Sequence, residues 1–193
     1  MGLLTLEHSR AAYRADFVLY GIAVFALASA LLVAGPRAQA LQIGACVLAG
    51  LASWSAVEYA LHRFVLHGLQ PFRRWHAEHH ARPAALIGTP TLLSAALIAT
   101  LVFLPALLAG TLWQACGLTL GLLIGYLAYA ATHHALHHWR AQSAWLKQRK
   151  HWHALHHHHP DVPGCFGVTT AFWDHVFGST GPSRRRGVHK ARG

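Results

Sequence analysis

The sequence predicts an all-α integral membrane protein with about four transmembrane helices, arranged in two hairpins beneath a histidine-rich helical cap. Of its 193 residues, 54% are hydrophobic and 11% are charged, whereas about 25% of an average soluble domain is charged. All of the 18 histidines except His8, His175 and His189 fall into four short clusters. Each cluster adjoins an apolar segment long enough to cross a bilayer. We therefore expect polar chemistry to gather at the ends of membrane helices.

The first two apolar segments predict one hairpin. Residues 17–34 and 41–60 each approach the length of about 20 residues that spans a bilayer, and Gly35, Pro36 and Arg37 break the helix between them. A cleavable signal peptide is the alternative for the first segment, with Ala38-Gln39-Ala40 as a loose cleavage site. The apolar run begins only after Asp16 and is long enough to span, so a membrane helix is favoured.

The second hairpin is predicted by a long stretch without charge. No Asp, Glu, Lys or Arg occurs from Pro83 to Trp139, which leaves room for two spans and a turn. We expect these spans at 86–108 and 112–132. The glycines and prolines inside them are compatible with membrane helices.

The basic residues predict the orientation. Lys and Arg concentrate at 10–14, 63–82, 140–150 and 184–192, whereas the other side carries Arg37 alone. By the positive-inside rule, both termini and all four histidine clusters should be cytoplasmic. The net charge of +10 is explained by anionic headgroups at this boundary, and no nucleic-acid partner is expected. We expect a single membrane domain over 1–193 with its core at 57–179, and a disordered basic tail at 183–193.

The spacing of the clustered histidines is typical of metal ligands. The clusters read LHRFVLH (61–67), HAEHH (76–80), HHALHH (133–138) and HWHALHHHH (151–159). Because residues three and four apart share a helix face, two clusters offer H-x-x-H-H triplets. The third cluster offers two pairs at equal spacing, one beginning at His133 and one at His134. His62 and His67 are five apart, about 140° on an ideal helix, but they could still converge if the helix ends or loosens near Arg63. One set per cluster gives about ten imidazoles, too many for one ion and suitable for two.

The acidic residues exclude several metal-site classes. The chain has six acids: Glu7, Asp16, Glu58, Glu78, Asp161 and Asp174. E-x-x-H pairs of the ferritin-like di-iron type and the H-E-x-x-H zinc motif are absent. The three cysteines form no C-x-x-C pair, which argues against a thiolate zinc site. A site of neutral imidazoles remains, and Glu58, Glu78, Asp161 and Asp174 are candidates to orient histidine N–H groups. Surface charge is the alternative for Asp161.

These motifs carry a resemblance to a known family. The boxes HRFVLHG, HAEHH, HHALHH and HALHH, followed by FGVTTAFWDHVFGS, resemble the fatty acid hydroxylase / sterol desaturase superfamily from Val57 to Ser179. The resemblance implies a membrane oxygenase with a histidine-ligated dimetal centre. Carried over by position, the ligands are His62, His67, His76, His79, His80, His133, His137, His153, His156 and His157. His134, His138 and His151 remain rivals within their boxes.

The resemblance also implies a reaction. Two iron ions, which zinc can displace during purification, would use O2 as co-substrate to hydroxylate a C–H bond of a lipid in the bilayer. A fatty-acyl lipid is favoured over a sterol or carotenoid, and desaturation is an alternative outcome. No heme domain is recognised in the sequence, so an external donor such as a ferredoxin or cytochrome b5-type protein is expected to supply two electrons.

A second function class is a histidine-rich metal transporter or metal-binding membrane protein. A transporter should place polar ligands within its spans, whereas here the histidines crowd one face. The segment at 166–177 is expected either to close over the site or to lie at the interface as an amphipathic helix. Tryptophans near the span ends are expected to anchor the protein as an aromatic belt, among them Trp75 and Trp139. His8, His175 and His189 are expected at the surface.

Overall fold

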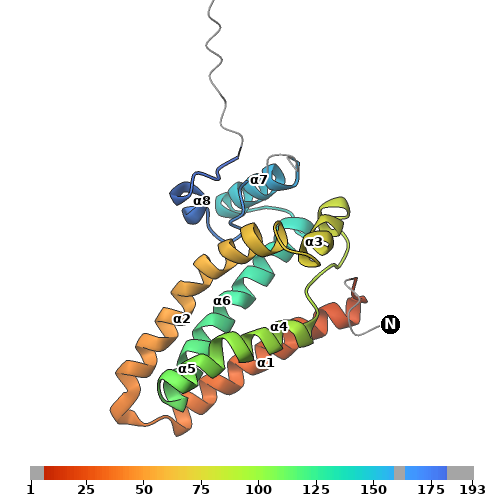
Figure 1. Ribbon diagram of the computed structural model, residues 1–193. Coiled ribbons are helices and arrows are strands. Elements are labelled where there is room, and N and C mark those ends of the chain that lie inside the picture. Colours follow the sequence, from red (N-terminus) through yellow and green to blue (C-terminus); the bar gives the residue numbers. More distant parts are fainter. Residues whose placement is uncertain (1–6, 159–163, 182–193) are drawn as a thin grey trace, which may run out of the picture.

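A computed structural model describes residues 7–158 and 164–181, and over these residues the protein is helical apart from one isolated bridge between Glu7 and Ile87 (Figure 1). Four helical segments are long and apolar enough to cross a membrane. They are α1 (Arg10–Ala34), α2 (Ala40–Ala60) continued by the π-helix η2 (Leu61–Leu66), α4–η3–α5 (Thr91–Ile98, Ala99–Phe103 and Leu104–Ala109), and α6 (Leu112–His138). The predicted all-α membrane class is confirmed.

The ends of the spans differ from those predicted. α1 begins at Arg10 rather than at residue 17, because the Ser9 side chain accepts a hydrogen bond from the Ala12 N–H and caps the helix. The third span begins at Thr91 rather than at residue 86. Pro90, just before the first residue of this span, has an extended backbone conformation. Proline also lacks the N–H that a helix continuing from the preceding segment would need. α6 starts as predicted but runs on to His138, so the histidine box HHALHH (133–138) is part of the membrane helix.

The most extensive helix interface joins α2 to α6, the second and fourth spans, rather than partners within either predicted hairpin. Gly50 of α2 and Gly121 of α6 make this close approach. A Cβ atom at Gly121 would collide with the carbonyl of Val47, and one at Gly50 would collide with the backbone of Leu118. Small residues let membrane helices approach until their backbones touch. This close contact fixes the rotation of α6 about its axis relative to α2.

α1 lies beside the third span and also contacts α6 (Figure 1). The Tyr20 hydroxyl lies 2.6 Å from Ser94 Oγ, and Thr91 Oγ1 donates to the carboxylate of Asp16 at 2.7 Å. An acid inside a membrane helix is costly unless it is paired. Asp16 is thus accommodated by a partner at the start of α4.

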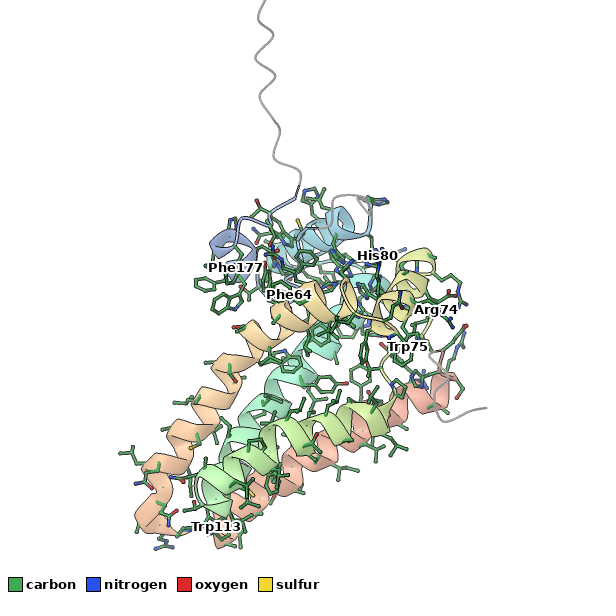
Figure 2. All side chains as sticks on the ribbon, viewed as in Figure 1. Phe64, Arg74, Trp75, His80, Trp113 and Phe177 are labelled. Carbon is green, nitrogen blue, oxygen red and sulfur yellow. The ribbon has the colours of Figure 1, made fainter. Side chains whose placement is uncertain are left out.

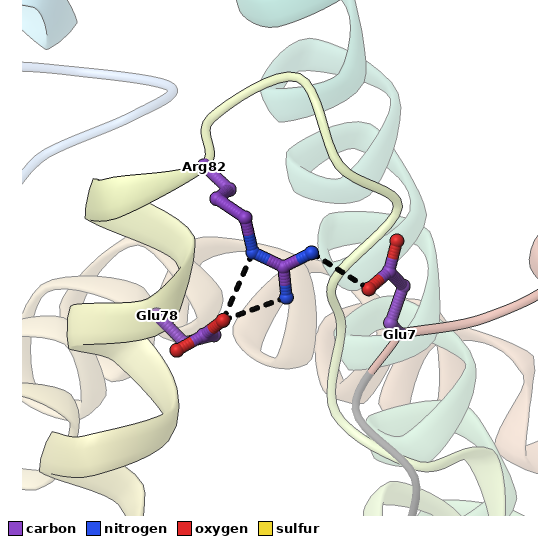
Figure 3. Close-up of polar contacts among 3 residues, drawn as sticks. All are labelled: Glu7, Glu78 and Arg82. Atoms are coloured by element: carbon purple, nitrogen blue, oxygen red, sulfur yellow. Dashed lines mark hydrogen bonds and ion pairs between the residues drawn. The ribbon is translucent and has the colours of Figure 1, made fainter.

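The helices α3 (Phe72–Ala81), α7 (Ala144–His158) and α8 (Phe172–Val176) form a cap at one end of the spans (Figure 1). The chain just before α1 lies at this same end. Arg82 joins the two parts, with Nη1 2.8 Å from Glu7 Oε2 and Nη2 2.6 Å from Glu78 Oε1 (Figure 3). These groups are half exposed, so the pairs contribute little stability. They do hold the N-terminal segment beside α3. The predicted helical cap is confirmed, and the predicted basic tail lies outside the described residues.

Candidate metal centre

The π-helix η2 brings the first two histidines together. The N–H of His67 donates to the carbonyl of His62 at 3.2 Å, a bond across five residues. This wider turn replaces the ordinary four-residue turn. The two imidazole rings consequently lie 5.4 Å apart, centre to centre. The helix loosens near Arg63, which is one of the two ways in which the sequence allowed these histidines to converge.

Histidines from three elements form a first cluster. Its members are His62, His67, His76, His80 and His156, each of which places one nitrogen within 4.8 Å of a nitrogen of every other. The Nε2 atom of His76 lies 3.0 Å from Nε2 of His62 and 3.0 Å from Nε2 of His80. Nε2 of His67 lies 3.1 Å from Nε2 of His156. The helices η2, α3 and α7 thus direct the same ring atom to one point.

A second cluster lies beside the first. It contains His79, His133, His137 and His153 within the same 4.8 Å limit. Nε2 of His137 lies 2.8 Å from that of His153 and 3.3 Å from that of His133. His157 adjoins this cluster, with Nε2 3.1 Å from that of His153, and its ring stacks on His80 of the first cluster at 4.2 Å. The structure therefore gathers all ten predicted histidines at the cap end of the spans.

The donor set fits metal ions. His79 is only 5% exposed, and both of its ring nitrogens are buried without a hydrogen-bond partner among the described residues. Buried polar groups are rarely left unsatisfied. With metal–nitrogen distances of about 2.0–2.1 Å, adjacent ligands of an ion lie roughly 3.0–3.4 Å apart. The Nε2 separations of 2.8–3.3 Å are close to this spacing.

Burial prepares these imidazoles as ligands. It lowers the pKa of His79 to about 3 and of His80 to about 4, with a further contribution from neighbouring histidines. Burial likewise lowers the pKa of His157 to about 2 and of His156 to about 4. A metal binds the neutral imidazole, so proton competition is weak near neutral pH. The cluster is held in the form that coordinates.

Two backbone carbonyls select the coordinating tautomer. His62 Nδ1 lies 2.5 Å from the carbonyl oxygen of Phe166, and His156 Nδ1 lies 2.7 Å from that of Gly164. A carbonyl oxygen only accepts, so Nδ1 must carry the proton in both rings. The lone pair then belongs to Nε2, which faces the first cluster. Such outer hydrogen bonds orient metal-binding histidines and raise their basicity.

Buried acids hold the loop that provides these carbonyls. The carboxyl of Glu58 accepts from the N–H groups of Val168 at 2.6 Å and Thr169 at 2.9 Å. The carboxyl of Asp174 accepts from the N–H groups of Phe166 at 2.9 Å and Gly167 at 2.8 Å. The expectation that these acids bind histidine N–H groups directly is wrong, because they act one layer further out.

Glu78 also departs from this expectation. Glu78 lies within the histidine box HAEHH (76–80) but faces outward and pairs with Arg82 (Figure 3). A residue two positions from His76 and one from His79 lies on a different side of the helix. Asp161 lies outside the described residues.

Arg149 and Cys165 belong to this outer layer but were not singled out by the sequence. Arg149 is 4% exposed; burial lowers its pKa, while the charges of Asp174 and Glu58 raise it in part. Cys165 has φ = 56°, unusual for a residue other than glycine. It lies between the two residues whose carbonyls bind His156 and His62. Only a backbone measurement identifies such a position, whereas Arg149 could have been suspected from its place on the helix of the last histidine box.

The model of the fatty acid hydroxylase family matches residues 47–179. The chain belongs to the fatty acid hydroxylase family. The matched region contains both histidine clusters, the π-helix and the loop that fixes the tautomers.

Relatives of this fatty acid hydroxylase family member include one fungal protein and one plant protein. The ceramide very long chain fatty acid hydroxylase scs7 of Schizosaccharomyces pombe is 36% identical over 146 residues, covering 69% of this chain and 41% of the relative. The dihydroceramide fatty acyl 2-hydroxylase FAH2 of Arabidopsis thaliana is 36% identical over 149 residues, covering 72% of this chain and 61% of the relative. The chain thus spans about half the length of these relatives.

A solved structure shares the fold. Full-length scs7p, in which only the hydroxylase domain is visible, superposes with a TM-score of 0.73 and 26% identity, covering 87% of this chain and 66% of the other. The shared region therefore includes membrane helices as well as the histidine-rich cap.

The terminal segment at 166–177 covers the first cluster with one of its aromatic rings. The ring of Phe166 lies 5.8 Å from His62, 5.4 Å from His67 and 5.6 Å from His156, centre to centre. Beyond it, α8 and the next residue expose apolar side chains, including Phe172 at 58% and Phe177 at 57% (Figure 2). The segment thus combines both predicted roles, since one end closes over the site and the other presents an apolar surface.

The rival histidines lie outside both clusters. His134 stacks on His138 at 4.5 Å, and its Nδ1 lies 3.2 Å from the hydroxyl of Tyr13. His151 is exposed on α7. The pair at 133 and 137 therefore occupies the position predicted for the third box.

A cavity of about 150 Å³ adjoins the clusters between α1, α3 and α6. His79 and His133 line it, together with Tyr126 and Tyr129. Trp75 also lines it rather than serving only as an interfacial anchor (Figure 2). His8, expected at the surface, is half buried in the same wall.

Proposed function

We propose that this protein hydroxylates a fatty-acyl lipid in the bilayer, using O2, two electrons and two iron ions. The carrying observation is the pair of adjoining all-histidine clusters at one end of four membrane spans. The names of the relatives, which are fatty acyl and ceramide hydroxylases, support the substrate class. One oxygen atom of O2 would enter a C–H bond, and the other would leave as water with two electrons and two protons.

The two clusters divide the ten ligands between two ions. The first ion would be held by His62, His67, His76, His80 and His156, and the second by His79, His133, His137, His153 and His157. When bound, the iron ions would supply the activation of O2 and the oxidation of an unactivated C–H bond. Zinc suits the same imidazoles and can replace iron in purified protein.

The chain's own residues perform the remaining work. Phe166 covers the first cluster, and the buried rings around it exclude water. The protons on Nδ1 of His62 and His156 stay on the carbonyl side, which keeps both Nε2 atoms as ligands. The cavity beside His79 and His133 would hold the acyl carbon that reacts.

The cap side should face the cytoplasm. α1 begins at this end, and the basic segments at 63–82 and 140–150 flank the cap helices, whereas Arg37 lies in the connection at the opposite end. The positive-inside rule supports this orientation. An external ferredoxin or cytochrome b5-type protein would deliver electrons there. Accessibility of a C-terminal epitope in sealed right-side-out vesicles tests the orientation, because labelling from outside would contradict it.

The decisive experiment combines metal analysis with a search for oxidised lipid. Protein purified without a histidine tag should carry about two iron or zinc equivalents, one per cluster. The double variant His79→Ala/His156→Ala removes one ligand from each cluster and should lose most of the metal. The double variant His138→Ala/His151→Ala removes two exposed histidines that lie in the histidine boxes but outside both clusters, and it should retain the metal.

Lipid extracts from cells with and without the protein are then compared under isotopically labelled O2. Incorporation of one labelled oxygen atom into an acyl chain, lost in His79→Ala/His156→Ala, would support hydroxylation. Two bound metals with no oxidised lipid in cells that supply an electron donor would contradict it and favour metal storage. Loss of two hydrogens without added oxygen would indicate desaturation instead.

A further inference from the structure

A second hollow lies on the other side of the contact between α1 and α6. This α1–α6 groove has a volume of about 630 Å³ and is lined by side chains of both helices, among them Tyr13 and Phe17 of α1 and Ala131 and His134 of α6. Arg10, Arg14 and Trp139 lie toward the cap end, while Val18 and Ala131 lie one to two turns deeper along their helices. A groove with a basic mouth and an apolar floor matches the head and chain of a lipid.

Only a thin wall separates the groove from the cavity at the metal centre. Tyr13 and Phe17 line both hollows. The Tyr13 hydroxyl lies 3.2 Å from Nδ1 of His134, and the ring of Phe17 lies 6.2 Å from that of His134. His133, the next residue of α6, lies on the cavity side. Three half-buried side chains and one hydrogen bond therefore close the path from the groove to the ligands.

The charge around the mouth favours an anion. Arg10 and Arg14 are one helical turn apart and both exposed, and like charges at this spacing repel each other. Among the described residues, no acidic side chain lines the groove. Asp16, on the same helix, is turned to the cavity and bonded to Thr91. Arginine beside tryptophan is typical of the headgroup region, where anionic lipid heads lie.

We propose that the α1–α6 groove is the lateral access route for an acyl lipid with an anionic head, and that Tyr13 and His134 form its gate. Arg10 and Arg14 hold the head, the chain lies against Val18 and Ala131, and displacement of the Tyr13 side chain opens the wall to the cavity. This inference rests on the proposed function, and it gives a role to a histidine outside the two clusters.

Photolabelling of the full-length protein tests occupancy without requiring turnover. The probe is a diazirine-bearing fatty acid in vesicles of neutral phospholipid, and the matching diazirine-bearing alcohol is the neutral comparison. Labelled peptides are expected from 10–18 and 131–139. Ala131→Trp, which fills the groove, should lower this labelling at least fivefold. Ala128→Trp is the matched control, because Ala128 is also exposed on α6 but does not line the groove.

The anionic preference is tested in parallel. Arg10→Gln/Arg14→Gln should lower labelling by the acid several-fold and leave labelling by the alcohol unchanged. Equal labelling by both probes, or an unchanged acid signal in this variant, would overturn the assignment of an anionic head. Equal labelling of Ala131→Trp and Ala128→Trp would overturn the groove as a lipid site.

Turnover separates this proposal from the proposed function. If the wild-type protein hydroxylates lipid, Ala131→Trp should be at least fivefold slower with unchanged metal content. Normal turnover in a variant that has lost labelling would overturn the access route while the hydroxylase assignment stands. Specific labelling of a wild-type protein that never oxidises lipid would contradict the hydroxylase and, with it, the access role of the groove.

Discussion

Replacing Glu58 by alanine should release metal without touching a single ligand. Its carboxyl accepts hydrogen bonds from the N–H groups of Val168 and Thr169 and from the Thr169 hydroxyl. These contacts hold the loop whose carbonyl at Phe166 fixes the tautomer of His62. Loss of the carboxyl frees the loop, so His62 can protonate on Nε2 and cease to coordinate.

The magnitude follows from the two backbone donors. Val168 is 1% exposed, so its N–H cannot turn to water. An unsatisfied buried donor costs about 1–3 kcal/mol, and the part-buried Thr169 N–H bears only a part of that cost, so the two together give roughly 2–4 kcal/mol. For a chain of this size, a loss of that order lowers the melting temperature by about 10 °C. Glu58→Gln retains an oxygen acceptor for both N–H groups and should lose about 1 kcal/mol.

The assay is metal content per chain together with the melting temperature from tryptophan fluorescence. Glu78→Ala is the matched control, because Glu78 lies next to His79 in sequence but is half exposed and pairs with Arg82. We expect Glu58→Ala to lose at least one metal, Glu58→Gln to recover most of it, and Glu78→Ala to match the wild type. Full metal content in Glu58→Ala, or equal losses in both alanine variants, would refute the outer-layer role of Glu58.

Three further predictions concern the ligands, the protonation of the centre and the packing of the spans. His79→Ala should lose about one of two metals by elemental analysis, whereas His138→Ala, an exposed residue outside both clusters, should keep both; equal retention would contradict the ligand assignment. The pKa of His79 lies at about 3 and that of His80 at about 4, below the ordinary value of 6.5. The unfolded chain therefore binds more protons below pH 6.5, and metal-stripped protein should lose stability as the pH falls from about 6.5 toward 4; a melting temperature that stays constant over this range would count against the burial of the clusters. Gly121→Ala should separate α2 from α6 and cost about 1–3 kcal/mol or more, seen as a lower melting temperature, whereas Gly44→Ala, which meets open space, should be neutral or slightly stabilising.

The sequence determined the parts of this protein that depend on local composition and spacing. Apolar length gave four spans, and the distribution of Lys and Arg predicted which ends lie together. The H-x-x-H-H triplet placed His76, His79 and His80 on one face of a single helix, and the structure divides them between the two clusters. Such features depend on residues within one or two turns, and helix geometry alone relates them.

Other features depended on contacts between distant segments. His133 and His134 have partners at the same spacing, and only the packing of α6 on α2 and α1 turns the first toward the cluster and the second toward Tyr13. Gly117, Gly121 and Gly125 lie four residues apart on α6, and the same spacing leads on to His133 and His137. The sequence shows this row, but only its contact with α2 shows that the row faces the interior of the protein.

The tautomers of the histidines also depend on contacts between distant segments. His62 receives its proton acceptor from Phe166, and that loop is held by Glu58, more than a hundred residues earlier. The sequence showed which residues could bind a metal, because an imidazole carries its chemistry wherever it lies. Only the tertiary structure showed which ring nitrogen faces the metal site. The hydrogen-bond partner of one nitrogen sets which nitrogen carries the proton, and that partner comes from a distant segment.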